Sequence, residues 1–475
     1  MQLTNDTVVS WIKERAIPIT TLDPQAPLND LVPLEQIVGN ATIVGLGEGS
    51  HGGREFFLMK HRLLRFLVEK MGFTLFAMEM SWMRAKAINE YILTGAGDSR
   101  EALKNHGFWV WNTQEVLDLI EWMRAYNADP QHTQKVHFAG FDCQVLGAAV
   151  LDTIVQYFQK VDPQRATQVA DLYKNLYEIN SRNLPDPPIR QQYIESANQV
   201  YEILQEHEIA YIALSSPQAF AQALQEAQVV KQCMQVIMYS DAAEHSDEYW
   251  TMVQQRDHFM AENIQWLHEH AEGGEKMVLW AHNWHIGTLA ERRHDRSGKA
   301  LPLNWMGVNV RQRYREHYLT IGFSFFEGSH NAILFNKDGI VLPRQIQVHT
   351  IVPASQESYH STLAKAGQLY LLDLRSVPAG EVSDWFSRPQ AFRDYGAEHM
   401  ADDDDSYQDV SLSAWFDAII QIDKISPTQL LPRAVLPPLE KTVEEEETAE
   451  IDDVWSTFHL RMWLLCLAQA TKERA

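Results

Sequence analysis

The stretch ATIVGLG (residues 41–47), followed by EFFLMKHRLLRFLVEKM (55–71) and FTLFAME (73–79), decides the fold class of this 475-residue chain. The two outer segments are short apolar runs with β-branched residues, a pattern typical of buried strands. In the middle segment, apolar residues recur from Phe57 onward at the spacing of an amphipathic helix, and Gly72 is suited to end that helix. A strand, a helix and a second strand with short connections predict a βαβ unit, whose strands are parallel.

Four more runs of the same kind follow, at residues 135–142, 276–282, 318–325 and 368–374. Residues 146–272 show no convincing strand pattern, and long stretches of them are rich in the helix formers Ala, Gln, Glu and Leu. The sequence therefore predicts an α/β fold with a mostly parallel central sheet flanked by helices. The helical segment is either a set of packing helices or an insertion that covers the active-site cleft, and we adopt the second interpretation.

The charge of the chain argues against some classes of partner. Lys and Arg number 40 against 63 Asp and Glu, for a formal net charge of −23 at pH 7. Phosphate groups are bound by clustered basic residues, so we expect neither nucleic acid nor a membrane as a partner. The sequence shows no signal-peptide pattern, no long apolar run and only three cysteines, from which we expect a cytoplasmic protein.

Polar residues lie where four of the predicted strands end. The first strand ends at Glu48, followed by Ser50 and His51; the second ends at Glu79, the third at Asp142, and the fourth at His282 with His285 just beyond. Ligands of parallel α/β sheets bind outside the carboxyl ends of the strands. A single acid there could cap a helix or form a turn. Capping does not require several histidines and two glutamates at one edge, so the set predicts a functional site.

Three other kinds of site share some of these features: a dinucleotide-binding loop, a serine nucleophile elbow and a metal site. Residues 47–52 spell G-x-G-x-x-G, but Glu48 would place a carboxylate against a dinucleotide's pyrophosphate, and Glu79 lies further on than the usual acidic residue. Ser50 lacks the first glycine of a hydrolase nucleophile elbow. The two late histidines could share a metal ion with a carboxylate, although no H-E-x-x-H motif or cysteine cluster is present. We expect no cofactor and no metal.

The chemistry that uses these groups together is direct attack by water. A histidine takes a proton from water near neutral pH, and a neighbouring carboxylate orients it and stabilises its charged form. Further histidines polarise a carbonyl group or protonate a leaving alkoxide. The set therefore suits ester hydrolysis without a nucleophilic Ser or Cys, and Cys143 is better interpreted as a buried structural thiol.

At these residues the chain resembles the erythromycin esterase family, whose members open macrolide lactone rings. The matching elements are GLGEGSHGGREFF (45–57), LLRFLVEKMGFTLFAMEM (63–80), FAGFDCQ (138–144), RDHFMAENIQWL (256–267), AHNWHI (281–286) and MGVNVRQRYREHYLTIGFS (306–324). The early G-E-x-[ST]-H combined with the late A-H-N-x-H-I is specific. Together the elements spread over roughly residues 35–425.

The resemblance implies catalytic roles by position. His51 matches the family's general base, and Glu48 matches the glutamate that assists it. The remaining acidic and histidine positions that line the cleft match Glu79, His282 and His285. The chain departs from the pattern at Lys60, nine residues after the base, where some macrolide esterases have arginine. Lysine keeps the charge but lacks the planar fork that binds a carboxylate through two hydrogen bonds.

The same patterns divide the chain into five parts. They are a first part of the α/β core with the catalytic loop (1–145), the helical insertion (146–272), a second part of the core (273–425), a Pro-bearing acidic linker (426–453) and a C-terminal helix (454–475). The last segment is apolar enough to dock on its own body or on a second subunit, so we expect it to be able to support a homo-oligomer.

The candidate substrate-binding residues are Lys60, Trp82, Asp142, Trp284 and Arg54. Aromatic walls suit a bulky, mostly apolar ligand. We predict a carboxylic ester hydrolase that cleaves a lactone or other ester, with 14-membered macrolides as candidate substrates and macrolide resistance as a candidate role. The alternatives are a metal-assisted hydrolase of another bulky ester and a homologue that binds a small ligand without turning it over.

Overall fold

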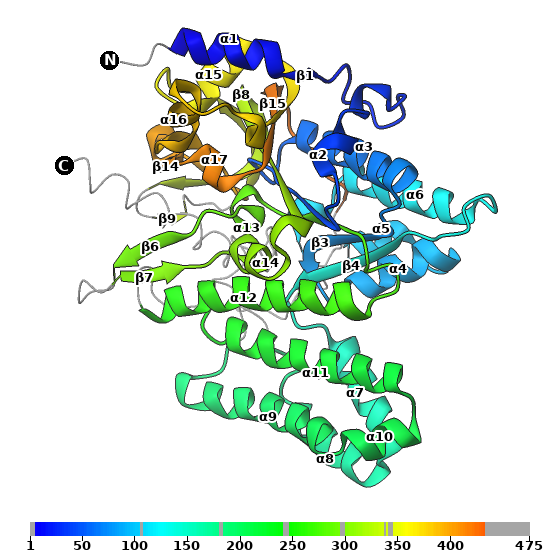
Figure 1. Ribbon diagram of the computed structural model, residues 1–475. Coiled ribbons are helices and arrows are strands. Elements are labelled where there is room, and N and C mark those ends of the chain that lie inside the picture. Colours follow the sequence, from blue (N-terminus) through cyan, green and yellow to red (C-terminus); the bar gives the residue numbers. More distant parts are fainter. Residues whose placement is uncertain are drawn as a thin grey trace.

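The structure is a computed structural model that describes residues 5–104, 108–179, 184–240, 247–294, 300–336, 339–340 and 345–432. A large central sheet is surrounded by helices (Figure 1). The part of the acidic linker after residue 432 and the C-terminal helix expected at 454–475 lie outside the described residues.

The central sheet has eleven strands, and its long path runs in the order β1-β11-β15-β8-β2-β5-β3-β4. Their bounds are β1 Ile17–Pro18, β11 Leu369–Asp373, β15 Ala418–Ile425, β8 Tyr318–Asn336, β2 Ile43–Leu46, β5 Met277–Trp280, β3 Leu75–Ser81 and β4 His137–Asp142. Every pair from β15 to β4 is parallel, whereas β11 and β1 are antiparallel additions. The predicted α/β fold with a mostly parallel sheet is therefore confirmed.

The long strand β8 carries the other three strands of the sheet. They are β9 (Gly339–Ile340), β10 (Ile346–Ile351) and β13 (Glu398–Met400). Two separate hairpin-like pairs are β6 (Glu291–His294) with β7 (Ala300–Leu303), and β12 (Gln390–Arg393) with β14 (Tyr407–Val410). The second half of β8 thus supports a layer that places residues 394–396 against the loop between β2 and α3.

The βαβ unit predicted at the start of the chain is β2, α3 (Arg54–Met71) and β3. Gly72 ends the helix at φ 72°, a left-handed conformation that costs glycine little, and its N–H bonds the carbonyl of Leu67. Burial of helix α3 extends beyond its apolar face, because Lys60 and Arg62 near its middle are also buried. Arg62 pairs with Asp30, and Lys60 points toward the functional site described below.

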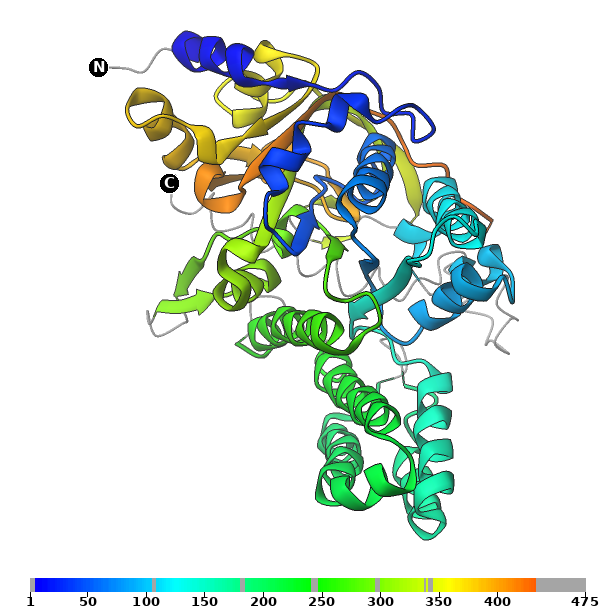
Figure 2. The same ribbon diagram turned by 45° about the vertical axis from the view of Figure 1, so that its right-hand side comes forward.

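The described part of residues 146–272 is entirely helical or in turns. Its helices are α7 (Ala148–Val161), α8 (Pro163–Tyr173), α9 (Pro187–Glu206), α10 (Glu208–Leu214), α11 (Pro217–Ile237) and α12 (Asp247–His270). Helices α7 to α11 form a lobe that projects beyond α12, and α12 itself lies along the sheet (Figures 1 and 2). The division of the chain into the five parts given above stays a prediction.

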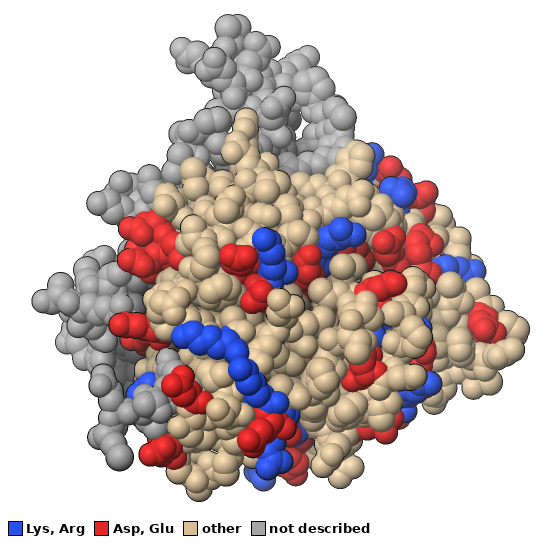
Figure 3. Space-filling view, turned by 90° about the horizontal axis from the view of Figure 1, so that it is seen from above, with Lys and Arg blue, Asp and Glu red and all other residues tan. Residues whose placement is uncertain are grey.

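The remaining helices fill the layers around the sheet. They are α1 (Asn5–Arg15), α2 (Leu34–Val38), α4 (Ala85–Thr94), α5 (Ser99–Lys104), α6 (Gln114–Ala128), α13 (Asn283–Ile286), α14 (Met306–Tyr314), α15 (Tyr359–Ala366), α16 (Glu381–Ser387) and α17 (Leu412–Trp415), with short 3-10 turns at Asn29–Leu31, Trp109–Trp111, Arg315–His317, Leu374–Ser376 and Asp403–Ser406. None of the helices in the described part of the chain combines the length and apolar character needed to cross a bilayer. On the face in Figure 3, acidic and basic side chains are interspersed over the described surface.

Candidate active site

Four neighbouring strand ends bring the predicted residues together. The strands β2, β5, β3 and β4 are adjacent and parallel, so their carboxyl ends meet at one edge of the sheet. The side chains gathered there are all buried: Glu48, His51, Glu79, Asp142, His282 and His285. Buried ionisable groups are costly unless they are paired, and the contacts below show how this site satisfies them.

Glu48 and His51 form a hydrogen-bonded pair in the loop between β2 and α3. The Nδ1 atom of His51 lies 2.6 Å from Oε1 of Glu48. Lys60, about two turns into α3, donates to the other carboxylate oxygen at 2.8 Å and to the carbonyl of Ala281 at 3.2 Å. When His51 donates its Nδ1 proton to Glu48, Nε2 is the ring nitrogen that can accept a proton from water.

Burial and these contacts set the protonation of the pair. Burial lowers the pKa of His51 from its usual value, and the hydrogen bond to Glu48 only partly opposes this effect. His51 is therefore neutral at neutral pH, as a general base must be. Burial likewise lowers the pKa of Lys60 to about 8, with Glu48 opposing. The Lys60 ammonium also lies 4.4 Å from the centroid of the Trp280 ring, a cation–π contact.

A second cluster is built around Arg256, which comes from α12. Its guanidinium donates to Glu79 at 2.8 Å and to the two oxygens of Asp142 at 3.1 and 3.0 Å. The pKa of Arg256 is raised above its usual value. Burial alone would lower this pKa, so the rise is due to the carboxylates of Asp142 and Glu79. Arg256 therefore ties the ends of β3 and β4 to the helix that crosses them.

His285 completes this second cluster. Its Nδ1 lies 2.9 Å from Asp257, the neighbour of Arg256 on α12, and its Nε2 lies 3.2 Å from Glu79. Burial on its own would lower the pKa of His285, but Asp257 and Glu79 raise it to about 9. His285 is therefore charged at neutral pH, in contrast to His51.

His282 stands between the two clusters. Its ring centroid is 5.2 Å from that of His51, and its backbone N–H donates to Glu79 at 3.1 Å. The Nε2 atom lies 2.9 Å from the carbonyl oxygen of Tyr395 and 3.4 Å from a carboxylate oxygen of Asp394. Burial lowers the pKa of His282, but Asp394 and then Glu48 more than offset it, so the net pKa is raised.

The candidate substrate-binding residues divide into two groups. Lys60 and Asp142 are inside the clusters, where each is bonded to a charged partner. Arg54 is half-exposed and pairs with Glu115 at 3.1 Å. Trp82 and Trp284 are buried in aromatic contacts, with Trp266 at 5.3 Å and with Trp415 at 4.5 Å respectively. The chain thus places two of the five among the catalytic candidates and three around them.

Sequence reasoning did not assign roles to Arg256, Asp257 or Asp394. Arg256 and Asp257 open the stretch RDHFMAENIQWL, one of the elements that carried the family resemblance, so a signal was present. Asp394 lies between β12 and β13, where no strand-end pattern marks it. Cys143 is buried, as expected, and burial raises the pKa of its thiol well above the usual value.

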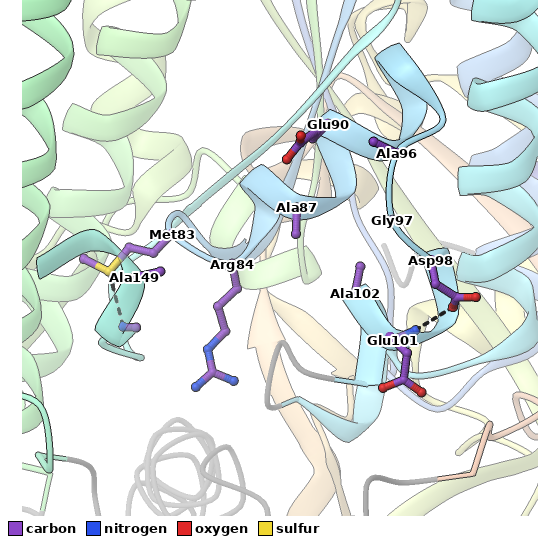
Figure 4. A pocket seen from close by; sticks show the side chains of 11 residues that line it. Met83, Arg84, Ala87, Glu90, Ala96, Gly97, Asp98, Glu101, Ala102 and Ala149 are labelled. Atoms are coloured by element: carbon purple, nitrogen blue, oxygen red, sulfur yellow. Dashed lines mark hydrogen bonds between the residues drawn. The ribbon is translucent and has the colours of Figure 1, made fainter. Parts of the chain in front are cut away.

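A cavity of about 520 Å³ lies between α4, α5 and the start of α7 (Figure 4). Met83 and Arg84, soon after Glu79, and Gly147, soon after Asp142, belong to its lining. It is mostly apolar, with Arg84 and Glu101 on its walls, and its volume is in the range of small-molecule sites. In the part of the chain that the structure covers, no three His, Cys, Asp or Glu side chains are placed so as to hold a metal ion.

A sequence profile of the erythromycin esterase family matches residues 68–425. The chain belongs to the erythromycin esterase family. Erythromycin esterase type II of Escherichia coli is 23% identical over 439 residues, which cover 89% of this chain and 98% of that protein.

Solved structures share the fold of this chain. A structure described as a succinoglycan biosynthesis protein is 28% identical, with a TM-score of 0.75 and coverage of 91% of this chain and 100% of the other. A mutant erythromycin esterase in its open conformation has a TM-score of 0.68 at 19% identity, covering 88% and 99%, and this likeness concerns the fold alone. As a family member, the protein is a hydrolase of the esterase type.

Proposed function

We propose that this hydrolase cleaves a lactone or another bulky carboxylic ester by direct attack of water that His51 activates. The observation that carries the proposal is a pair of buried hydrogen bonds on the carboxylate of Glu48. Lys60 lies 2.8 Å from one of its oxygens and Nδ1 of His51 lies 2.6 Å from the other. A carboxylate bonded to Nδ1 fixes the tautomer and orientation of an imidazole whose Nε2 acts as a base. The lowered pKa of His51, caused mainly by burial, keeps that base in its active form at neutral pH.

The proposed reaction needs no covalent intermediate. Nε2 of His51 takes a proton from water while the oxygen attacks the carbonyl carbon, which forms a tetrahedral oxyanion. The carbon–oxygen bond to the alcohol then breaks, and the leaving alkoxide receives a proton from the site. The products are a carboxylic acid and an alcohol, or one ring-opened hydroxy acid when the substrate is a lactone.

The charged groups beside His51 support the stabilisation of the oxyanion. His282 lies 5.2 Å from His51, centroid to centroid, and the carboxylates around it raise its pKa despite burial. A positive charge held in a buried site stabilises a developing oxyanion more strongly than it would in water. Arg256 and His285 hold Glu79 in place and balance its charge, which keeps the second wall of the site rigid.

Fourteen-membered macrolides are the substrates that we propose to test first. The support is the family membership and the tryptophans around the site. Lys60 stands at the position where some macrolide esterases have arginine. Because Lys60 binds Glu48 through one oxygen rather than meeting a substrate, this difference concerns the base more than the substrate.

The test is a panel of macrolides, simple lactones and acyclic esters, with products detected by mass spectrometry as a gain of one water. Replacement of His51 with Gln is expected to reduce kcat at least ~10²-fold, the usual size of a general-base contribution. The exposed His317 is the matched control, and its replacement with Gln should leave turnover unchanged. Absence of turnover on every ester would overturn the proposal, and near wild-type turnover by H51Q would overturn the role of His51.

A separate measurement tests the macrolide role. Expression of the chain in a macrolide-sensitive bacterium should raise the minimum inhibitory concentration of a 14-membered macrolide, and H51Q should not raise it. Ester turnover without such protection would retain the hydrolase and reject the resistance role.

A further inference from the structure

A short segment far along the chain closes over the catalytic loop. We call residues 394–396 the clasp segment, which lies between β12 and β13. The N–H of Tyr395 donates to the carbonyl of Gly49 at 2.8 Å, and the N–H of His51 donates to the carbonyl of Gly396 at 3.1 Å. The carbonyl of Tyr395 in turn lies 2.9 Å from Nε2 of His282. The clasp segment therefore contacts both histidines that face each other in the site.

Asp394, the first residue of the clasp segment, is the part that carries charge. It is 1% exposed, and its Oδ1 lies 3.4 Å from Nε2 of His282, an ion-pair distance. The pKa of Asp394 is raised from its usual value, because burial outweighs the opposing contact with His282. A buried carboxylate beside an imidazole is stable when the imidazole carries the compensating charge.

The other charged groups that face His282 come from three elements. They are Glu48 and His51 in the loop after β2, Glu79 at the end of β3 and His285 on α13. Glu48 already shares its charge with Lys60, and Glu79 with Arg256 and His285. Among the described residues around His282, Asp394 is thus the carboxylate whose ion pair is with His282 itself.

We propose that Asp394 is a positioning residue for hydrolysis, because its carboxylate holds the ring of His282 beside His51 and favours the charged form of His282, which disfavours a proton on His51. This inference rests on the proposed function and extends it to a residue on the clasp segment. The Nε2–H of His282 is directed to the carbonyl of Tyr395, so the ring is held by both residues of the same segment. A positive His282 disfavours a second positive charge on His51, which lies about 5 Å away.

The proposal predicts that two ionisations move in opposite directions when Asp394 is replaced with Asn. Without the carboxylate, His282 loses its proton at lower pH, and His51 then becomes easier to protonate. The free enzyme needs a neutral His51 and a charged His282, so the pH profile of kcat/KM should narrow from both sides. Each limb should move by about 2 pH units, as expected for unit charges about 5 Å apart at an effective dielectric constant of about 20.

The kinetic test compares wild type, D394N and D404N on an ester that the wild type hydrolyses. Asp404 is exposed on the 3-10 turn Asp403–Ser406, and its replacement is the same chemical change away from the site. D404N should have the wild-type profile. A uniform loss of activity in D394N with both limbs unmoved would overturn the proposal, because a purely structural role predicts that result.

A second measurement needs no substrate, and it titrates the wild-type protein. In wild-type protein labelled with ¹⁵N-histidine, NMR titration should show His282 losing its proton at higher pH than His51, with the two resonances identified by their loss in H282Q and H51Q. The reverse order would overturn the role of Asp394. A wild type that hydrolyses no ester but shows the expected order would retain this electrostatic coupling and reject the proposed function alone.

Discussion

Replacement of Arg256 with Met should destabilise the protein by about 3–5 kcal/mol, the usual cost of removing one partner from a buried ion pair. The guanidinium is fully buried and makes three bonds of 2.8 to 3.1 Å to Glu79 and Asp142. Met fills a similar space, so the packing loss is small and the cost is that of leaving two carboxylates buried without their cation. His285 balances only part of the charge on Glu79.

The assay is urea unfolding followed by circular dichroism at pH 7, with R313M as the matched control. Arg313 pairs with Glu269 at the surface, where both side chains are more than one-third exposed, and such a pair contributes at most ~1 kcal/mol. A loss in R256M no larger than that in R313M would refute the reasoning. The triple variant with E79Q and D142N should recover much of the loss, because the uncompensated charges are then absent.

Three further outcomes follow from the site. The pKa of His285 is raised to about 9, so its contribution to the free energy of unfolding is complete below about pH 6.5 and is lost as the pH rises to 9. In urea unfolding, H285Q should lack this decline. A parallel pH dependence of stability in the two proteins would contradict the expectation. Replacement of Gly52 with Ala should reduce kcat at least tenfold, which corresponds to about 1.4 kcal/mol in the activation free energy. The reason is that the added Cβ would lie 1.9 Å from the carbonyl oxygen of Asn331. Turnover of G52A at the wild-type rate would contradict this close approach. K60M should move the acid limb of the pH profile of kcat/KM to higher pH, because Glu48 then raises the pKa of His51 without an opposing cation. K60R keeps the charge and should leave the limb in place. An unmoved limb in K60M would show that Lys60 does not affect the pKa of His51.

The central sheet could be predicted because its signals are local in sequence. Each of the six predicted runs became a strand, and α3 ended at Gly72 as its pattern indicated. The antiparallel additions and the order of strands could not be predicted, because they depend on pairing between distant segments. The same limit applies to β8, which continues to Asn336 because β10 and β13 pair with its second half.

The site was predictable for the same reason, and only to the same extent. Glu48, Glu79 and His282 each lie at or just after the carboxyl end of a strand, so the parallel sheet alone brings them together. Arg256 lies in the middle of a long amphipathic helix, where a basic residue normally belongs to the solvent-facing side. Only the position of α12 across the ends of β3 and β4 turns it inward, and no pattern within the helix encodes that position.

The protonation of the three central histidines follows from how many cations share each carboxylate. Glu48 faces His51 but also Lys60, so its charge is balanced without a proton on His51. His285 faces two carboxylates, Asp257 and Glu79, with Arg256 as the other cation, and His282 faces Asp394. A buried site is least costly when its charges cancel locally, so the surroundings favour a proton on these two histidines and a neutral His51. In the proposed mechanism, the arrangement thereby favours one base among three chemically identical rings, and it does so through Lys60 and Asp394, which need not touch the substrate.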